Sequence, residues 1–309
     1  MAVYEHGYKP YAGVTTPEWS RFLIIPHHAY RDVFRSKIFV AFFAVCFIYP
    51  LVAAILIYLH HNVNAISMLK IGDVRELIPI DASFFLYFVV TQGMLGFFLN
   101  LLIGPPLISR DLANNALPLY LSRPFTRTEY VAGKMSVILI LLSLITWIPG
   151  LLLFLLQAYL EGAGWIGNNL WMAGSIILGS LVWIVVLAFL SQAISAWVKW
   201  RVVASAALLA IFFIPAAFGA IINVLFTTRW GNLLSLPTVM KMVWAGLFGL
   251  FKRQVTDMQI FIGNDGEGTV SQITLMEPPL WTAWAVLALL CVFCLWLLSR
   301  KVRAYEVVK

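Results

Sequence analysis

The chain has 309 residues, of which 61% are hydrophobic and 11% are charged, and its formal net charge is +7 at pH 7. Soluble globular domains contain about 25% charged residues, so this composition excludes an ordinary soluble domain. No segment supports nucleic-acid binding, because the basic residues are divided among loops between long apolar runs. The first 37 residues hold no long apolar core followed by a small-residue cleavage site, so no cleaved secretory signal is expected.

Residues 16–38 are expected to form an interfacial helix. The segment mixes aromatic residues such as Trp19, Phe22 and Tyr30 with several basic residues. This pattern predicts an amphipathic helix at the cytoplasmic membrane surface, with basic groups toward the headgroups and aromatic groups toward lipid. Pro26 is expected to bend or interrupt it. The alternative is a plain N-terminal extension that leads into the first span.

Six windows without Asp, Glu, Lys or Arg predict membrane-spanning helices, because each meets the roughly 20 residues that cross a hydrocarbon core of about 30 Å. They run approximately over residues 38–59, 83–107, 135–158, 172–197, 202–226 and 280–299. Only the stretch 197–201 separates the fourth window from the fifth, which predicts a tight hairpin between antiparallel helices. The expected fold is an all-α membrane protein with a single transmembrane domain over residues 1–309.

The distribution of Lys and Arg predicts the orientation. The N-terminal segment, the loop 108–134, the hairpin and the C-terminal tail together hold 15 Lys and Arg, whereas the other loops hold six. Acidic residues divide the other way, with six against eight. Cytoplasmic loops carry the basic excess in membrane proteins, so both termini and the loop 108–134 are expected in the cytoplasm.

The loop 108–134 is too long and too polar for a simple turn. A short cytoplasmic helix is expected from Arg110 to Leu121, and Pro124 ends it because the residue before a proline avoids the helical region. Thr126 and Glu129 then fit a capping box, with Thr126 as the N-cap of the third span.

A Gly-Pro-Pro sequence, Gly104, Pro105 and Pro106, lies just before this loop at the end of the second span. Proline frees backbone carbonyls and allows a helix to bend. One interpretation is a hinge between the short cytoplasmic helix and the membrane part. The other is a simple exit of the chain from the membrane.

Residues 227–279 are expected to form a long external loop. Within it, residues 231–251 are apolar but contain Lys241 and Pro237, which predicts one or two short re-entrant helices that dip into the outer leaflet. A seventh full span is the competing interpretation. We reject it because it would move the C-terminus and its four basic residues to the outside.

Motifs for chemistry are absent from the sequence. No G-x-x-x-x-G-K-[ST] motif occurs, so this chain has no phosphate-cradling loop of its own. The glycine-rich stretch 162–169 is interpreted as an external turn. The three cysteines lie in apolar runs and are interpreted as buried hydrophobic residues, and the adjacent histidines at 27–28 and 60–61 as interfacial polar residues. No catalytic, cofactor or metal site is predicted.

The predicted spans contain no charged side chain, whereas ion-coupled pumps usually keep one within the membrane. If the protein moves a solute, its energy is therefore expected from a partner. The uncharged interior favours an apolar or amphipathic cargo. The polar residues Gln92, Asn100 and Asn223 are the candidates for a pathway.

The loop 108–134 resembles the cytoplasmic loop of type-2 ABC exporter permeases, the ABC-2 or type V exporter-like family. It has an Arg-Asp pair at 110–111 after a span, then ALPLYL at 116–121 and SRPFTRTEYVAGK at 122–134. The stretch RDVFRSKIFVAFF at 31–43 is similar to the family's approach to its first span. The layout of interfacial helix, six spans, cytoplasmic loop and external helices extends the resemblance over the whole chain.

The resemblance implies a non-enzymatic permease subunit of an ATP-driven exporter, with multiple spans in a prokaryotic cytoplasmic (inner) membrane. Two such subunits, identical or different, would pair with two P-loop ATPase subunits that bind ATP and Mg, and a short coupling helix in the loop 108–134 would sit in a cleft of the ATPase. The residues implied to lie nearest the ATPase are Arg110, Asp111, Leu112, Arg123, Pro124, Arg127 and Glu129.

Two alternatives stay open. Ordinary anchoring of a cytoplasmic loop explains the basic residues of 108–134, but it explains neither the acids nor the cap. A non-transporting anchor or scaffold for a larger assembly is the alternative function. A membrane-embedded enzyme ranks last, because the spans hold no paired acids and no nucleophile–base set. The long segment 227–279 departs from simpler family members and leaves the substrate class open.

Overall fold

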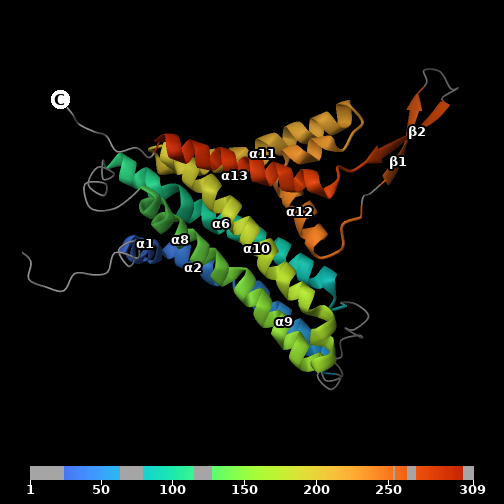
Figure 1. The fold of residues 1–309 in the computed structure, drawn as a ribbon, viewed down its shortest axis with the longest axis horizontal. Helices are drawn as coiled ribbons and strands as arrows, with labels where there is room; N and C mark the ends of the chain where they lie inside the picture. Colours follow the sequence, from blue (N-terminus) through green and yellow to red (C-terminus); the bar gives the residue numbers. More distant parts are fainter. Residues whose placement is uncertain (1–23, 63–78, 115–126, 253–254, 263–268, 302–309) are drawn as a thin grey trace, which may run out of the picture.

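The computed structural model describes residues 24–62, 79–114, 127–252, 255–262 and 269–301. In chain order its helices are α1 (Ile24–Phe34), α2 (Lys37–Val45), α3 (Ile48–His61), α6 (Ala82–Ala113), α8 (Arg127–Ile145), α9 (Trp147–Glu161), α10 (Ala163–Trp197), α11 (Arg201–Leu225), the 3-10 helix η2 (Trp230–Leu234), α12 (Leu236–Leu247) and α13 (Leu280–Lys301). Two strands, β1 (Val255–Ile262) and β2 (Thr269–Met276), lie between α12 and α13. The long helices form one elongated bundle (Figure 1).

Six helical segments of the described chain are long and apolar enough to span a membrane, which confirms the predicted six-span, all-α membrane architecture. They are Lys37–His61, Ala82–Asp111, Thr128–Glu161, Gly164–Trp197, Arg201–Leu225 and Leu280–Lys301. Each predicted window overlaps one of them, and the ends agree to within four residues except that the third and fourth spans begin seven and eight residues earlier than predicted. The fourth and fifth spans are joined by residues 198–200 alone, so the predicted tight hairpin is also present.

The interpretation of residues 162–169 as a turn is wrong for most of that stretch. Gly162 alone makes the turn, with φ at 101°, and α10 begins at the next residue. Positive φ is open to glycine because it has no Cβ, so one residue is enough to reverse the chain between α9 and α10. The other two glycines of the stretch, Gly164 and Gly167, lie within the first turns of α10.

Prolines divide two of the spans. Pro50 follows the break between α2 and α3, and Pro149 follows the break between α8 and α9. Each proline removes the N–H that would bond the carbonyl four residues earlier. For Pro50 that carbonyl belongs to Cys46, and the buried Gln92 side chain of α6 donates to it at 3.1 Å. The break in the first span is thus stabilised by the second.

The core of the bundle is the contact between α6 and α10. The Trp183 indole of α10 donates to the carbonyl of Gly93 at 2.8 Å, and about two turns further along α6 the Asn100 amide donates to the carbonyl of Leu187 at 3.5 Å. A Cβ at Gly104 would lie 2.6 Å from the Cβ of Ser191, so only glycine permits this approach of the two backbones. Glycine and polar side chains therefore set the register of the two central helices.

The segment 227–279 packs on this core through α12. The Trp244 side chain is 3% exposed, and its indole donates to the carbonyl of Gly179 at 2.9 Å. A Cβ at Gly93 would lie 2.6 Å from the Trp244 ring, so the ring fills the space left by that glycine. The short helix α12 therefore inserts a side chain between α6 and α10.

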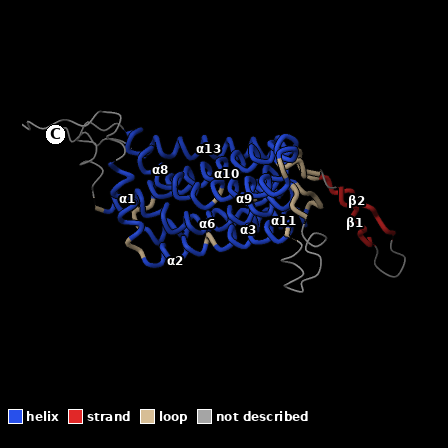
Figure 2. Tube along the Cα trace, turned by 90° about the horizontal axis from the view of Figure 1, so that it is seen from below, coloured by secondary structure: helices blue, strands red, loops and turns tan. Residues whose placement is uncertain are grey.

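The segment 227–279 contains the predicted short helices and also a β-hairpin that was not predicted. Strand β1 pairs antiparallel with β2 from Val255–Met276 to Ile262–Thr269, and the hairpin lies beyond the end of the bundle opposite to α1 (Figures 1 and 2). A seventh span is absent from the described residues, because α12 has only 12 residues. Insertion of α12 into the outer leaflet stays a prediction.

The packing of η2 on α11 gives a test of the fold. A Cβ at Gly219 would lie 2.2 Å from the carbonyl oxygen of Gly231, a backbone atom that cannot rotate away. We expect Gly219→Ala to separate η2 from α11 and to destabilise the protein by about 1–3 kcal/mol. Thermal unfolding of the detergent-solubilised protein measures this. Gly174→Ala is the matched control, because a Cβ there meets nothing within 4 Å; equal melting temperatures for the two variants would contradict the packing.

Candidate functional site

The residues predicted to contact an ATPase lie at the end of the bundle that holds α1, the α10–α11 hairpin and the end of α13 (Figure 1). Arg110, Asp111 and Leu112 belong to the last turn of α6, and Arg127 and Glu129 to the first turn of α8. Arg123 and Pro124 lie outside the described residues, as do Thr126 and most of the predicted short helix. The structure therefore describes both flanks of the loop 108–134 and not its centre.

The prediction that a separate short cytoplasmic helix begins at Arg110 is wrong. Residues Arg110–Ala113 do not begin a separate helix but continue α6, which runs unbroken from Ala82 to Ala113 through Pro105 and Pro106. Proline interrupts a helix only where nothing replaces the bonds that it removes. The neighbouring helices supply such replacements here.

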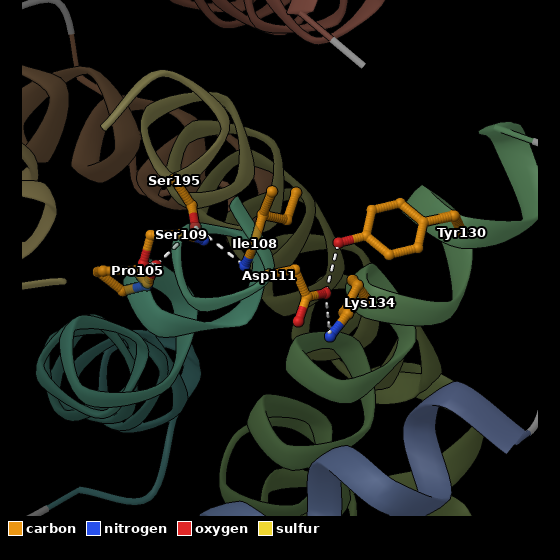
Figure 3. Close-up of polar contacts among 7 residues, drawn as sticks. All are labelled: Pro105, Ile108, Ser109, Asp111, Tyr130, Lys134 and Ser195. Atoms are coloured by element: carbon orange, nitrogen blue, oxygen red, sulfur yellow. Dashed lines mark hydrogen bonds and ion pairs between the residues drawn. The ribbon is translucent and has the colours of Figure 1, made fainter. Parts of the chain in front are cut away.

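Asp111 joins the two flanks of the loop. Its Oδ2 atom lies 2.9 Å from the Lys134 Nζ and accepts a hydrogen bond of 2.6 Å from the Tyr130 hydroxyl (Figure 3). Tyr130 and Lys134 are four residues apart on α8, so they share one face of that helix. These three residues form the Asp111 clamp, which ties the last turn of α6 to the first two turns of α8.

The clamp is shielded from solvent. The Tyr130 residue is fully buried, and the side chains of Lys134 and Asp111 are only 9% and 15% exposed. Burial makes a charge costly unless it is paired and hydrogen-bonded, and here the carboxylate has both a cation and a hydroxyl donor. Breaking this contact would leave a buried charge without a partner. The contact therefore holds the two helices in one relative position.

The second element of the site is the turn of α6 that follows the two prolines. The Ser195 hydroxyl of α10 donates to the carbonyl of Pro105 at 2.5 Å and accepts from the amides of Ile108 and Ser109 at 3.1 and 2.8 Å (Figure 3). The Ser109 hydroxyl also donates to the Pro105 carbonyl, at 2.7 Å. One side chain of α10 thus binds both ends of a single turn of α6, which we call the Ser195 turn.

A third contact explains why the helix continues past its prolines. Pro105 has no N–H for the carbonyl of Leu101, and the Ser205 hydroxyl of α11 donates to that carbonyl at 3.3 Å. Gly104 is packed against Ser191 of α10, as described above. The predicted hinge is therefore a helical segment surrounded by hydroxyl groups from two other spans, and its role as a hinge stays a prediction.

The clamp and the Ser195 turn are close along α6. Asp111 follows Ser109 by two residues and Pro105 by six, which is about 9 Å of helix at 1.5 Å per residue. A displacement of the first turns of α8 would act on Asp111 and, through less than two helical turns, on the bonds of Ser195. The arrangement can therefore transmit a movement of the loop 108–134 into the membrane part.

Helix α1 packs against α8 beside the clamp. The Tyr30 hydroxyl lies 3.5 Å from the carbonyl of Ser136, and burial raises the pKa of Tyr30, so it stays protonated and can donate. Pro26 lies within α1 and does not interrupt it, because a proline in the first turn removes no intrahelical bond. Placement of α1 at a membrane surface is not tested and stays a prediction.

The three residues predicted for a pathway lie in different places. Gln92 and Asn100 are fully buried between helices of this chain and donate to the backbone carbonyls of Cys46 and Leu187. Asn223 lies near the far end of α11, where its side chain accepts from the Gly231 amide and donates to Asn232, both at 2.8 Å. Each therefore makes contacts that hold helices together, and their role in a pathway stays a prediction.

Sequence reasoning missed Ser195, Ser205, Tyr130 and Lys134 as partners in this site. The spacing of Tyr130 and Lys134 was a signal that they share a helix face, but nothing in the spacing identifies Asp111 as their partner. Within the described residues, no group of three or more His, Cys, Asp or Glu is placed to hold a metal ion. The Nε2 atom of His61 instead lies 2.6 Å from a carboxylate oxygen of Glu161, at the opposite end of the bundle.

The comparison with protein families gives one result. Residues 23–299 match the model of a family described as ABC-2 family transporter protein. The match covers most of the chain, including five spans in full and the sixth up to residue 299, the described flanks of the loop 108–134 and the hairpin of β1 and β2. No curated protein matches the chain.

The Asp111 clamp predicts non-additive effects of substitution. Asp111→Asn or Lys134→Met alone leaves a poorly compensated group in a buried position, and we expect each to destabilise the protein by about 3 kcal/mol. The double variant removes both charges and should lose clearly less than the sum. Thermal unfolding of the four proteins measures the coupling, with Lys199→Met, an exposed residue at the same end, as the control. Strictly additive losses would show that the ion pair does not hold the helices.

The Ser195 turn predicts a difference between two buried serines of α10. Ser195→Ala removes one donor and one acceptor from the Ser195 turn, and unpaired buried polar groups cost about 1–3 kcal/mol. Ser191→Ala should cost less, because the Ser191 hydroxyl bonds only the carbonyl of Ala188 in its own helix. Hydrogen exchange of the amides of residues 107–109 is expected to quicken in Ser195→Ala and to stay unchanged in Ser191→Ala; the same exchange in both variants would refute the assignment.

Proposed function

The chain belongs to the ABC-2 transporter family, and on that premise we propose that it is the membrane-spanning permease subunit of an ATP-driven exporter. A separate P-loop ATPase supplies the energy in this proposal, because the sequence contains no phosphate-binding loop. The loop 108–134 receives the movement of the ATPase, and the membrane part converts it into movement of a substrate out of the cytoplasm.

The single observation that carries this proposal is the Asp111 clamp. It joins the two flanks of the loop 108–134 by a shielded ion pair, and it lies less than two helical turns from the Ser195 turn in the core of the bundle. Anchoring of a loop at the cytoplasmic surface requires basic residues, but it requires neither a buried carboxylate nor a direct link to the central helices. Coupling of the loop to the spans requires both.

The proposed orientation places the end with the clamp in the cytoplasm. Among the described residues, that end holds the basic residues of α1, the α10–α11 hairpin and the last turn of α13. The end with η2, α12 and the β-hairpin then lies outside. Since cytoplasmic segments carry the basic excess, both termini lie in the cytoplasm in this proposal.

The proposed transporter contains a second permease subunit. In the first and fifth spans only 22% and 17% of the most apolar window is buried within this chain, which is less than in the four other spans of the described residues. Such surfaces are covered either by lipid or by another protein. We propose that a second permease subunit, identical or different, covers part of them, and that the substrate path forms between the two.

The proposal predicts that a P-loop ATPase co-purifies with the tagged chain from its native membrane. Glu129→Lys, in the first turn of α8, is expected to reduce this association, whereas Lys252→Glu at the opposite end should leave it intact. Asp111→Asn is expected to retain the ATPase but to lower ATP hydrolysis of the complex in vesicles roughly tenfold, which is a typical size for coupling between sites. Membrane insertion of each variant is checked by protease accessibility.

Two outcomes would count against the proposal. If no ATPase accompanies the wild-type chain, the alternative of a membrane scaffold gains support. If Asp111→Asn binds the ATPase and hydrolyses ATP at the wild-type rate, the loop is attached to the ATPase but does not transmit its movement through the clamp.

A further inference from the structure

We propose that a groove at the end of the bundle with the clamp binds the phosphate of an anionic lipid headgroup between Arg110 and Arg201. The groove has a volume of about 720 Å³ and is lined by residues of α1, α2, α6, α8 and the start of α11. The binding site is assigned from the charges and the exposed apolar residues of the groove, and it does not depend on the proposed direction of transport.

The two arginines are exposed cations that both line the groove, one from the end of α6 and one from the first residue of α11. Neither forms an ion pair with any described residue. The guanidinium group has a planar set of donors that fits phosphate oxygens two at a time. Arg110 and Arg201 therefore offer a phosphate site that the described chain leaves unused.

The net charge of the groove suits a ligand with a single negative charge. Lys134 and Asp111 also line it, but they neutralise each other in the clamp. Asp32 of α1 is the other acid that faces the groove, and it offsets one of the two arginines. The groove thus carries one net positive charge, which suits the monoanionic phosphodiester of a phospholipid better than a multiply charged anion.

Exposed apolar residues distinguish a lipid from a free phosphate ion. Ile38 of α2 and Val202 of α11 line the groove and are 73% and 70% exposed. Each is the second residue of its membrane-spanning segment, so both lie where headgroups give way to acyl chains. Leu102 of α6, which is 41% exposed, continues this surface away from the arginines. The acyl chains of a bound lipid would contact these residues, whereas inorganic phosphate would make no contact with them.

The groove also reaches the Ser195 turn. Pro106 and Leu107 line it, and so does Ser205, which bonds the carbonyl of Leu101. A lipid bound there contacts the segment of α6 between the prolines and the Asp111 clamp. Its presence is therefore expected to restrict movement of that segment.

The test measures lipid retained by the purified full-length protein. The protein is delipidated in detergent, titrated with phosphatidylglycerol or phosphatidylcholine, and the bound lipid is counted by native mass spectrometry. We expect phosphatidylglycerol to be retained in preference to the zwitterionic lipid. Arg201→Gln and Arg110→Gln should each weaken its retention roughly tenfold, since each removes a charge-assisted contact to phosphate. Lys199→Gln, an exposed cation two residues from Arg201 that does not line the groove, should leave it unchanged.

A second arm separates the apolar contact from the charge. Ile38→Ser and Val202→Ser are expected to weaken phosphatidylglycerol retention and to leave competition by inorganic phosphate unchanged. If inorganic phosphate displaces the lipid completely at millimolar concentration, the groove is a phosphate site and the lipid assignment is overturned. Unchanged lipid retention in both arginine variants, with loss of self-association instead, would overturn it in favour of an interface between two copies of the chain.

Discussion

Proline removes a backbone N–H donor, and inside a bilayer no water is available to satisfy the carbonyl that is left without a partner. Two polar contacts between helices of this bundle meet that constraint directly. Gln92 of α6 donates to the carbonyl freed by Pro50, and Ser205 of α11 donates to the carbonyl freed by Pro105. Ser195 of α10 forms hydrogen bonds to both ends of the turn of α6 that follows Pro105. Breaks in one span are thus stabilised by hydroxyl and amide groups of another.

The same constraint joins the membrane part to the loop 108–134. Because α6 keeps its helical form past Pro105 and Pro106, it extends to Asp111, where the clamp with Tyr130 and Lys134 begins. Without the Ser195 turn, the prolines would separate that end of α6 from the rest of the helix. These polar contacts therefore keep α6 a single continuous helix from its contact with α10 to the loop 108–134. The proposed coupling of an ATPase to this permease depends on that continuity.

Helix α12 meets the central helices at the other half of α6. Trp244 of α12 lies against Gly93 and Gly179, on the same two helices that carry the Ser195 turn further along. Movements of α6 relative to α10 would consequently act on α12 as well. This arrangement gives the segment 227–279 a direct mechanical connection to the site, through a single buried indole.

The sequence by itself determined the number of spans, their approximate positions and the polar loop that carries the family resemblance. These features follow from apolar length and from the positions of Lys and Arg, which are local properties of the chain. It also determined that Pro105 and Pro106 free backbone carbonyls, but not whether the helix would end there. It did not predict the β-hairpin, because the stability of strands β1 and β2 depends on their pairing with each other, which is not a property of either segment alone.

Only the tertiary structure decided which residues meet. Asp111 and Lys134 are 23 positions apart, and Ser195 is about 90 positions from Pro105, so their contacts depend on how α6, α8 and α10 pack. The pattern of a single helix shows which side chains share a face, as for Tyr130 and Lys134, but not what lies opposite. Gln92 shows the difference most clearly: its sequence position suggested a pathway, and the packing places it against a carbonyl freed by a proline in another helix.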